Sequence, residues 1–157
     1  MASPYSYHRI NRFGLIKIRL NLWLIFIYTM HHILLLALSI TIKAPELKDW
    51  VMNHPLLFLA SIPTIILMLV ESTRLPSYNA HAMMRKIWNS GRMVLISGVL
   101  LDTMLIGFYS YKNQPDIDMG FVPFIVINIG VIFYLIRSEY ITALFDSFPE
   151  KEDKATK

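Results

Sequence analysis

The amino-acid sequence predicts an all-α integral membrane protein, a four-helix bundle with both termini in the cytoplasm and short amphipathic helices on that side. Two observations predict this fold class. Of the 157 residues, 55% are apolar and only 17% are charged, whereas about a quarter of the residues of a soluble domain are charged. The apolar residues also gather into four long runs, each of the length that a helix needs to cross a bilayer. A chain of this length forms one compact unit, so residues 1–157 are predicted to be a single membrane domain.

The first two runs predict the first two spans. Residues 20–42 contain no charged side chain, and at about 1.5 Å per residue this helix is roughly 34 Å long, enough for the hydrocarbon core with some tilt. Residues 50–70 contain Pro63, which removes one backbone donor and predicts a kink in the second span. Neighbouring helices tolerate such a kink because they supply partners for the freed carbonyl.

The third and fourth spans are predicted at residues 93–111 and 119–136. The third is apolar except for Asp102 and Thr103, and the fourth contains Asn128. Helices on the surface of a soluble protein carry a polar face along their whole length, and none of the four runs has one. Lipid is therefore the predicted solvent of these segments.

Two further stretches are predicted to be helical without crossing the membrane. Residues 78–90 and 138–148 each place apolar side chains on one face at helical spacing. We interpret both as helices at the cytoplasmic surface that pack against the end of the bundle, with docking of a partner protein as the alternative. Residues 150–157 mix charges of both signs and predict a flexible tail.

The basic residues predict the orientation, because short cytoplasmic connections of membrane proteins carry an excess of Lys and Arg. The N-terminal segment, the connection between the second and third spans, and the C-terminal segment hold four basic residues each. The other two connections together hold the remaining three of the 15. This distribution places both termini and the middle connection in the cytoplasm.

The composition excludes several classes of chemistry. The chain has no cysteine, which excludes disulfides, thiolate nucleophiles and cysteine-ligated zinc. The basic residues lie at the ends of the apolar runs, where anionic lipid headgroups rather than nucleic acid are the expected partners. A Gly-rich phosphate loop, a Gly-x-Ser-x-Gly motif and a His-Glu-x-x-His motif are all missing from the sequence. We therefore expect no enzyme activity and no cofactor, with a lipid-modifying enzyme as the weakest alternative.

Polar side chains inside the predicted spans are the candidate functional residues, because polar groups are energetically costly in a membrane. Each span places at least one of them near its centre. This intramembrane polar layer comprises His31, His32, Thr64, Asp102 and Asn128. Because the first and third spans run in the same direction, the two histidines and Asp102 are expected at similar depth.

An aspartate in hydrocarbon requires either a proton or a partner, and histidine is a natural partner. We therefore predict an interhelical hydrogen-bonded pair between Asp102 and one of the two histidines, which lie about 100° apart on a helix. A structural clasp is the favoured interpretation. The alternatives are a proton or ion pathway, contact with a lipid headgroup or partner helix, and a metal site. The metal site is the least favoured and none is predicted, because consecutive histidines do not share a helix face as an i, i+4 pair does.

Three stretches together resemble a known family. They are YHRINRFGLIK at residues 7–17, RKIWNSGR at 85–92, and YLIRS at 134–138 followed by FDSFPE at 145–150. In this order and spacing the chain resembles the YfeZ-like inner-membrane proteins of Gram-negative bacteria, a domain family of unknown function. The resemblance implies four spans in a bacterial inner membrane and supplies no reaction or ligand. His31 and His32 depart from the family pattern, in which an aromatic, basic or proline residue is expected.

These three stretches all lie at the predicted cytoplasmic boundary. There they predict a collar in which glycines permit close backbone approach and arginines bind phosphate or carboxylate. The collar comprises Gly14, Lys17, Trp88, Gly91, Arg92 and Arg137. Lipid headgroups are its expected occupants, with a partner protein as the alternative.

Two functions are compatible with the sequence. The first is a non-enzymatic accessory or assembly subunit of an inner-membrane complex, suggested by the small size, the short connections and the amphipathic cytoplasmic segments. The second is a small oligomeric carrier or channel for protons, ions or an amphiphile, suggested by the intramembrane polar layer. The expected partners are membrane lipids and either another membrane protein or further copies of this chain.

Overall fold

The computed structural model describes residues 16–73, 82–112 and 122–148, and every regular element within these ranges is a helix. The elements are α1 (Leu20–Thr29), α2 (His31–Thr41), α3 (Pro45–Asn53), the 3-10 helix η2 (Pro55–Ser61), α4 (Ile62–Ser72), α5 (Ala82–Asn89), α6 (Gly91–Lys112), α7 (Val122–Arg137) and α8 (Glu139–Asp146). The predicted all-α fold class is confirmed.

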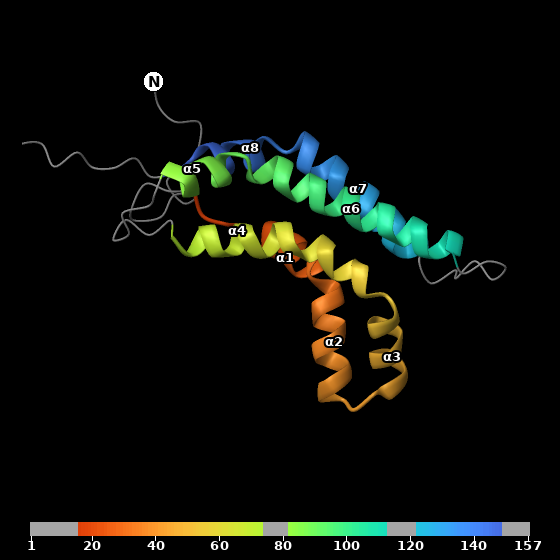
Figure 1. Ribbon diagram of the computed structural model, residues 1–157. Helices are drawn as coiled ribbons and strands as arrows, with labels where there is room; N and C mark the ends of the chain where they lie inside the picture. The colour runs from red at the N-terminus through yellow and green to blue at the C-terminus, as the bar shows by residue number, and fades with distance from the viewer. Residues whose placement is uncertain (1–15, 74–81, 113–121, 149–157) are drawn as a thin grey trace, which may run out of the picture.

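The helices form an elongated bundle with one projecting arm (Figure 1). Helices α1, α4, α6 and α7 run along the bundle, and α5 and α8 lie at one end of it. Helices α2 and α3 pack against each other and form a hairpin that stands away from the bundle. Among the described helices, η2 with α4 (Pro55–Ser72) and α6 are each long and apolar enough to cross a membrane. The bent pairs α1–α2 and α7–α8 would raise the number to four if each pair is one span.

The outer surface of the bundle is apolar. On α6 and α7 the large exposed side chains include Met93, Met104, Phe108, Val126, Ile129 and Phe133. A soluble protein seldom exposes a continuous apolar surface of this kind, because each exposed side chain would order water around it. This surface suits the acyl chains of a bilayer, as the composition predicts.

The first predicted span differs from the continuous helix expected over residues 20–42. The helix breaks at Met30, and α2 leaves α1 at an angle of 71°. Neither proline nor glycine occurs at the break. Side chains instead supply partners for the last carbonyls of α1, because the Ser61 hydroxyl donates to the Thr29 carbonyl and His31 Nδ1 lies 2.7 Å from the Tyr28 carbonyl oxygen. Such bonds satisfy the carbonyls that a helix end leaves open, and they stabilise the break.

The second predicted span begins later than expected. Trp50 belongs to α3, and the long helix starts at Pro55. Pro63 lies in the first turn of α4, where a missing N–H group costs little. In place of the kink predicted at Pro63, the 3-10 helix η2 changes into the α-helix α4 next to this residue.

A helix of the structure corresponds to each of the remaining predicted spans and amphipathic segments. Helix α6 contains the predicted third span, and α7 covers the fourth from residue 122 onward. Helices α5 and α8 fall within the two predicted amphipathic segments, and α8 turns away from α7 by 65° after Ser138, whose hydroxyl accepts from the Ile141 N–H. Residues 78–81, 119–121 and 150–157 of the predicted segments lie outside the described ranges.

The hydrophobic core consists of two separate clusters. The larger cluster lies at the end of the bundle near α5 and α8 and includes Leu22, Phe26, Leu67, Trp88, Leu95, Leu135, Ile141 and Phe145. The smaller cluster contains Leu57, Ile106 and Tyr109. On α6, Asp102 lies between Leu95 of the first cluster and Ile106 of the second. The polar residues therefore lie in a layer with apolar packing on both sides.

Candidate functional site

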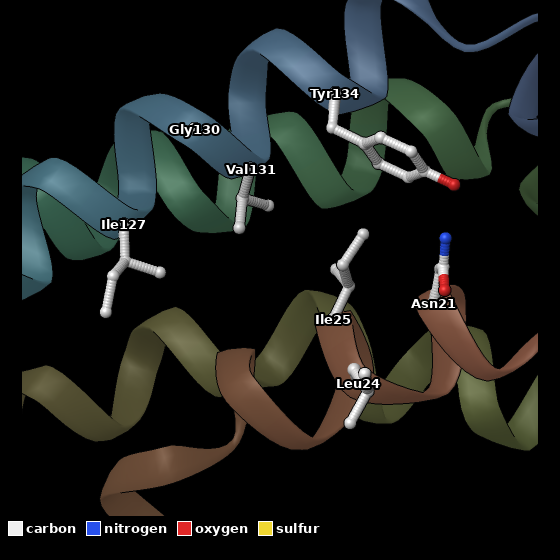
Figure 2. Close-up of a pocket in the computed structure, with 7 residues that line it drawn as sticks. All are labelled: Asn21, Leu24, Ile25, Ile127, Gly130, Val131 and Tyr134. Carbon is white, nitrogen blue, oxygen red and sulfur yellow. The ribbon is translucent and has the colours of Figure 1, made fainter.

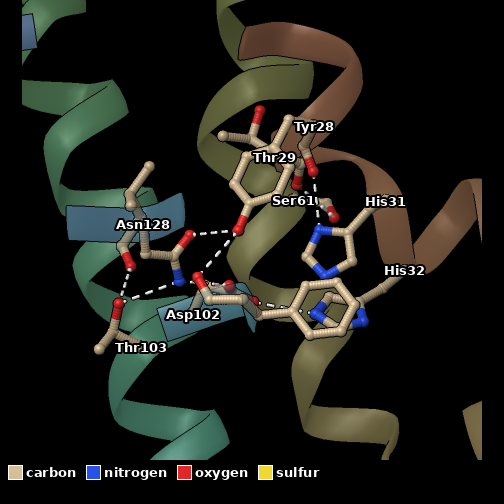
Figure 3. Close-up of polar contacts among 10 residues, drawn as sticks. Tyr28, Thr29, His31, His32, Ser61, Asp102, Thr103 and Asn128 are labelled. Atoms are coloured by element: carbon tan, nitrogen blue, oxygen red, sulfur yellow. Dashed lines mark hydrogen bonds and ion pairs between the residues drawn. The ribbon is translucent and has the colours of Figure 1, made fainter. Parts of the chain in front are cut away.

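Asp102 is the centre of a hydrogen-bonded network inside the bundle (Figure 3). His32 Nε2 lies 2.9 Å from Asp102 Oδ1, and Asn128 Nδ2 donates to Asp102 Oδ2 at 2.8 Å. The exposed fractions are 5% for Asp102, 2% for His32 and 0% for Asn128. The structure thus pairs Asp102 with His32 rather than with His31, and the carboxylate joins α2, α6 and α7.

Asn128 extends the network to α1. Its Nδ2 group also donates to Thr103 Oγ1 at 3.0 Å, and its Oδ1 atom accepts from the Tyr28 hydroxyl at 2.7 Å. The Tyr28 hydroxyl lies 3.2 Å from the Phe124 carbonyl oxygen as well. Every polar atom of the Asn128 side chain therefore has a partner, as a buried amide requires.

Thr64 lies beside this network in a pair of its own. Its hydroxyl is 2.7 Å from the Thr29 hydroxyl, and the Ser61 hydroxyl donates to the Thr29 carbonyl at 3.1 Å. These bonds connect the end of α1 to η2 and α4. Of the five residues of the predicted polar layer, the structure joins His32, Asp102 and Asn128 directly, whereas Thr64 binds Thr29.

His31 occupies a distinct position at the break. Its ring stacks between Tyr28 and Phe124, with centroids 5.2 and 5.1 Å away, and its Nδ1 atom faces the Tyr28 carbonyl oxygen. The centroids of the His31 and His32 rings are only 3.8 Å apart. One nitrogen of each ring, His31 Nε2 and His32 Nδ1, is buried and has no hydrogen-bond partner.

The sequence analysis missed the hydroxyl groups of the network, which belong to Tyr28, Thr29, Ser61 and Thr103. One signal was present in the sequence, because Tyr28 lies too deep in the first apolar run to belong to an interfacial aromatic belt. A tyrosine at that depth needs an internal partner for its hydroxyl. The three smaller hydroxyls gave no such signal, because Ser and Thr side chains in a helix commonly bond a carbonyl of the preceding turn, as Thr29 and Thr103 do here.

Much of the predicted collar contacts α8 of this chain. Trp88 is fully buried, donates from Nε1 to the Leu144 carbonyl at 3.1 Å, and packs against the Phe145 ring with centroids 4.9 Å apart. Gly91 lies directly against the same ring. The buried Trp88 indole is therefore not available to a lipid headgroup, which differs from the contact predicted for it.

The other described collar residues divide into two groups. The Arg92 guanidinium donates to the Ile136 carbonyl at 2.6 Å and to the Thr142 hydroxyl at 3.0 Å, so it holds α7 and α8 to α6. The side chains of Lys17 and Arg137 are exposed, and the Lys17 carbonyl accepts from the Tyr140 hydroxyl at 2.9 Å. Gly14 lies outside the described residues. Lys17 and Arg137 remain accessible to lipid.

A groove of about 390 Å³ runs between α1 and α7 (Figure 2). It is lined by Asn21, Leu24, Ile25, Ile127, Gly130, Val131 and Tyr134. Apolar side chains line most of its length, and Asn21 and Tyr134 lie near each other at one end. Gly130 leaves open space there, since a Cβ atom added to it would meet no other atom within 4 Å.

The fold and the network define this protein as an α-helical membrane-type protein whose bundle carries a buried His–Asp–Asn network at a broken helix. The chain belongs to the family described as "Protein of unknown function (DUF2919)", whose family model matches residues 5–147. Comparison with curated proteins and with solved structures found no match.

Proposed function

We propose that this protein is a non-enzymatic accessory or assembly subunit that binds another membrane protein through the α2–α3 hairpin. The observation that carries this proposal is the departure of the hairpin from the bundle at 71°. The hairpin lacks support from the bundle on its outer faces, and those faces need a partner of mixed polarity.

The two helices of the hairpin expose side chains of different polarity. Helix α2 exposes Leu34, Leu38 and Ile40, with exposed fractions of 43%, 47% and 60%. Helix α3 exposes Glu46, Lys48, Asp49 and Met52. Lipid tails suit the apolar side chains, but charges beside hydrocarbon cost several kcal/mol. A membrane-protein surface with apolar and polar parts would satisfy both helices at once.

The proposed setting is a bacterial inner membrane that the chain crosses four times, with both termini in the cytoplasm. The distribution of basic residues supports this orientation, and the resemblance to the YfeZ-like proteins supports the location. Membrane lipids are further proposed partners. The groove between α1 and α7 has the apolar lining that an acyl chain requires, and the exposed Lys17 and Arg137 side chains suit anionic headgroups.

Site-specific photo-crosslinking combined with purification in a mild detergent tests the proposed subunit role. A photoreactive residue in place of Leu38 on α2 is expected to cross-link to one membrane protein, which also co-purifies in stoichiometric amount. The matched control replaces Met104, which is 70% exposed on α6, and is expected to give no cross-link to that protein. Recovery of the chain alone, without a cross-link at Leu38, would refute the role.

A small oligomeric carrier or channel is the second candidate, and one observation favours it. Two imidazole nitrogens without partners lie next to the buried Asp102 carboxylate, an arrangement seen in proton pathways of membrane proteins. Protein reconstituted in liposomes should then carry protons down a pH gradient, and Asp102→Asn should abolish that flux. Liposomes with wild-type protein that are as tight as empty ones over a range of pH would eliminate this candidate.

A further inference from the structure

We propose that His31 and His32 form a binding site for one divalent transition-metal ion of the zinc class. His31 Nε2 and His32 Nδ1 are the proposed ligand atoms, and Asp102 is the positioning residue that orients His32. This inference concerns a binding site and does not depend on the proposed subunit role.

Hydrogen bonds fix which nitrogen of each ring carries a proton. The Tyr28 carbonyl oxygen only accepts, so His31 Nδ1, at 2.7 Å from it, must donate. The Asp102 carboxylate accepts at both oxygens, so His32 Nε2 donates to Oδ1. In a neutral imidazole the second nitrogen then holds a free lone pair. The lone pairs are therefore on His31 Nε2 and His32 Nδ1.

These two nitrogens are the same atoms that the structure leaves buried without a hydrogen-bond partner. His32 is 2% exposed, so water does not reach it from the outer surface. A buried acceptor without a donor is uncommon in proteins and calls for an explanation such as an ion. Histidine ligands of metals characteristically donate their other N–H group to a carboxylate or a main-chain carbonyl. His32 and Asp102 provide the first arrangement, and His31 with the Tyr28 carbonyl provides the second.

The positions of the groups are compatible with a shared ion (Figure 3). One ligand atom from each of His31, His32 and Asp102 lies within 4.8 Å of the others, and the two ring centroids are 3.8 Å apart. Ligands of a tetrahedral zinc ion are about 3.3 Å apart, given bonds of about 2.0–2.1 Å. The nearby carboxylate offsets part of the ionic charge within an apolar bundle.

The break in the helix explains why the sequence disfavoured this site. On a continuous helix, consecutive side chains diverge by about 100°. Here both histidines begin α2 immediately after the break at Met30, and the His31 ring folds back onto the carbonyl of Tyr28. The two rings consequently lie next to each other, with their planes tilted by 42°.

Titration of the purified full-length chain tests the site. The protein is prepared in detergent without a polyhistidine tag, treated with a chelator, and titrated with Zn²⁺ by calorimetry and with Co²⁺ by visible absorption. We expect one equivalent of either ion to bind and the Co²⁺ spectrum to show nitrogen ligation. His31→Gln and His32→Gln are expected to lose this equivalent.

His54→Gln is the matched control. His54 is also buried, and its Nδ1 atom likewise lies 2.7 Å from a main-chain carbonyl, that of Trp50, but it is not part of the His31–His32 cluster. It is expected to leave Zn²⁺ binding unchanged. Asp102→Asn should keep the fold and lower the affinity by about tenfold or more, as loss of a residue that orients a ligand does.

Two results would overturn the proposal. One is the absence of a bound equivalent of Zn²⁺ and of Co²⁺ in the wild-type chain. The other is binding that persists unchanged in both His31→Gln and His32→Gln. Thermal unfolding without metal reports whether each variant folds. Even if the histidine variants do not fold, the wild-type Co²⁺ spectrum shows whether the ion has nitrogen ligands.

Discussion

Asp102→Leu is expected to lower the thermal unfolding midpoint in detergent by several degrees, whereas Asp102→Asn leaves it nearly unchanged. Leucine removes the acceptor of two buried donors, His32 Nε2 and Asn128 Nδ2. A donor left without an acceptor in a protein interior costs at least about 1 kcal/mol, so two of them cost about 2 kcal/mol. For a chain of this size that corresponds to a fall of about 4–8 °C, at about 2–4 °C per kcal/mol.

A membrane environment reduces the expected loss of stability in Asp102→Leu only in part. Single hydrogen bonds between membrane helices contribute about 0.6 kcal/mol on average, because broken partners find substitutes. Within this network substitutes are scarce. The Tyr28 hydroxyl is already committed to Asn128 Oδ1, and only Thr103 remains for Asn128 Nδ2. His32, buried beside the Asp102 side chain, has no second acceptor within the described part of the chain.

Asp102→Asn preserves the network because His32 is able to change its tautomer. The introduced amide accepts from Asn128 through its oxygen and donates to His32 Nε2 through its nitrogen. His32 then carries its proton on Nδ1, an atom that has no partner to lose. The same change places the proton of His32 on the nitrogen proposed to bind metal and so lowers the metal affinity, and the two substitutions therefore separate the stability of the fold from ligand binding.

Intrinsic tryptophan fluorescence during heating measures both variants, since Trp88 lies in the main core cluster. An Asp102→Leu chain as stable as the wild type would show that the network contributes nothing to stability. A loss of stability in Asp102→Asn equal to that in Asp102→Leu would show instead that His32 does not change its tautomer.

The sequence was sufficient for the parts of the fold that a single segment determines by itself. Helix α6 follows the predicted third span closely, because an uninterrupted apolar run pairs all its backbone groups internally. The break at Met30 was not predictable in the same way. It depends on the Ser61 hydroxyl from another helix, and no proline or glycine marks it in the sequence.

In the candidate site as well, one feature was predictable from a single segment and another depends on contacts between helices. The presence of Asp102 among apolar residues was enough to predict a histidine partner at similar depth. The choice of His32 over His31 depends on the rotation of α2 after the break, which the sequence does not determine. In the collar, Trp88 was predicted to contact lipid or a partner because its sequence stretch lies at the cytoplasmic boundary, whereas in the structure it is fully buried and bonds the Leu144 carbonyl of α8.

Gly91→Ala is expected to destabilise the protein although alanine is the better helix former. A Cβ atom at this position would overlap Cε1 and Cδ1 of the Phe145 ring. The Phe145 ring is 1% exposed and packs against Trp88, whose Nε1 group binds the Leu144 carbonyl. The ring therefore has no free space into which to move, and α8 must shift as a unit.

Overpacking of this kind costs about 1–3 kcal/mol, which exceeds the gain in helix propensity of up to about 1 kcal/mol from replacing glycine with alanine. Gly107→Ala is the matched control on the same helix, because a Cβ atom there meets nothing within 4 Å. The control is expected to raise the unfolding midpoint slightly, so the two substitutions should act in opposite directions.

The double substitution Gly91→Ala with Phe145→Leu identifies the cause of the loss. Leucine lacks the ring atoms that the new methyl group meets, so the double variant should be more stable than the sum of the two single effects predicts. The thermal midpoints of the four chains in one detergent measure this coupling. If Gly91→Ala raised the midpoint as Gly107→Ala does, α8 would not pack against the start of α6, and the hydrogen bond from Arg92 to Thr142 that joins the two helices would have to be reassigned.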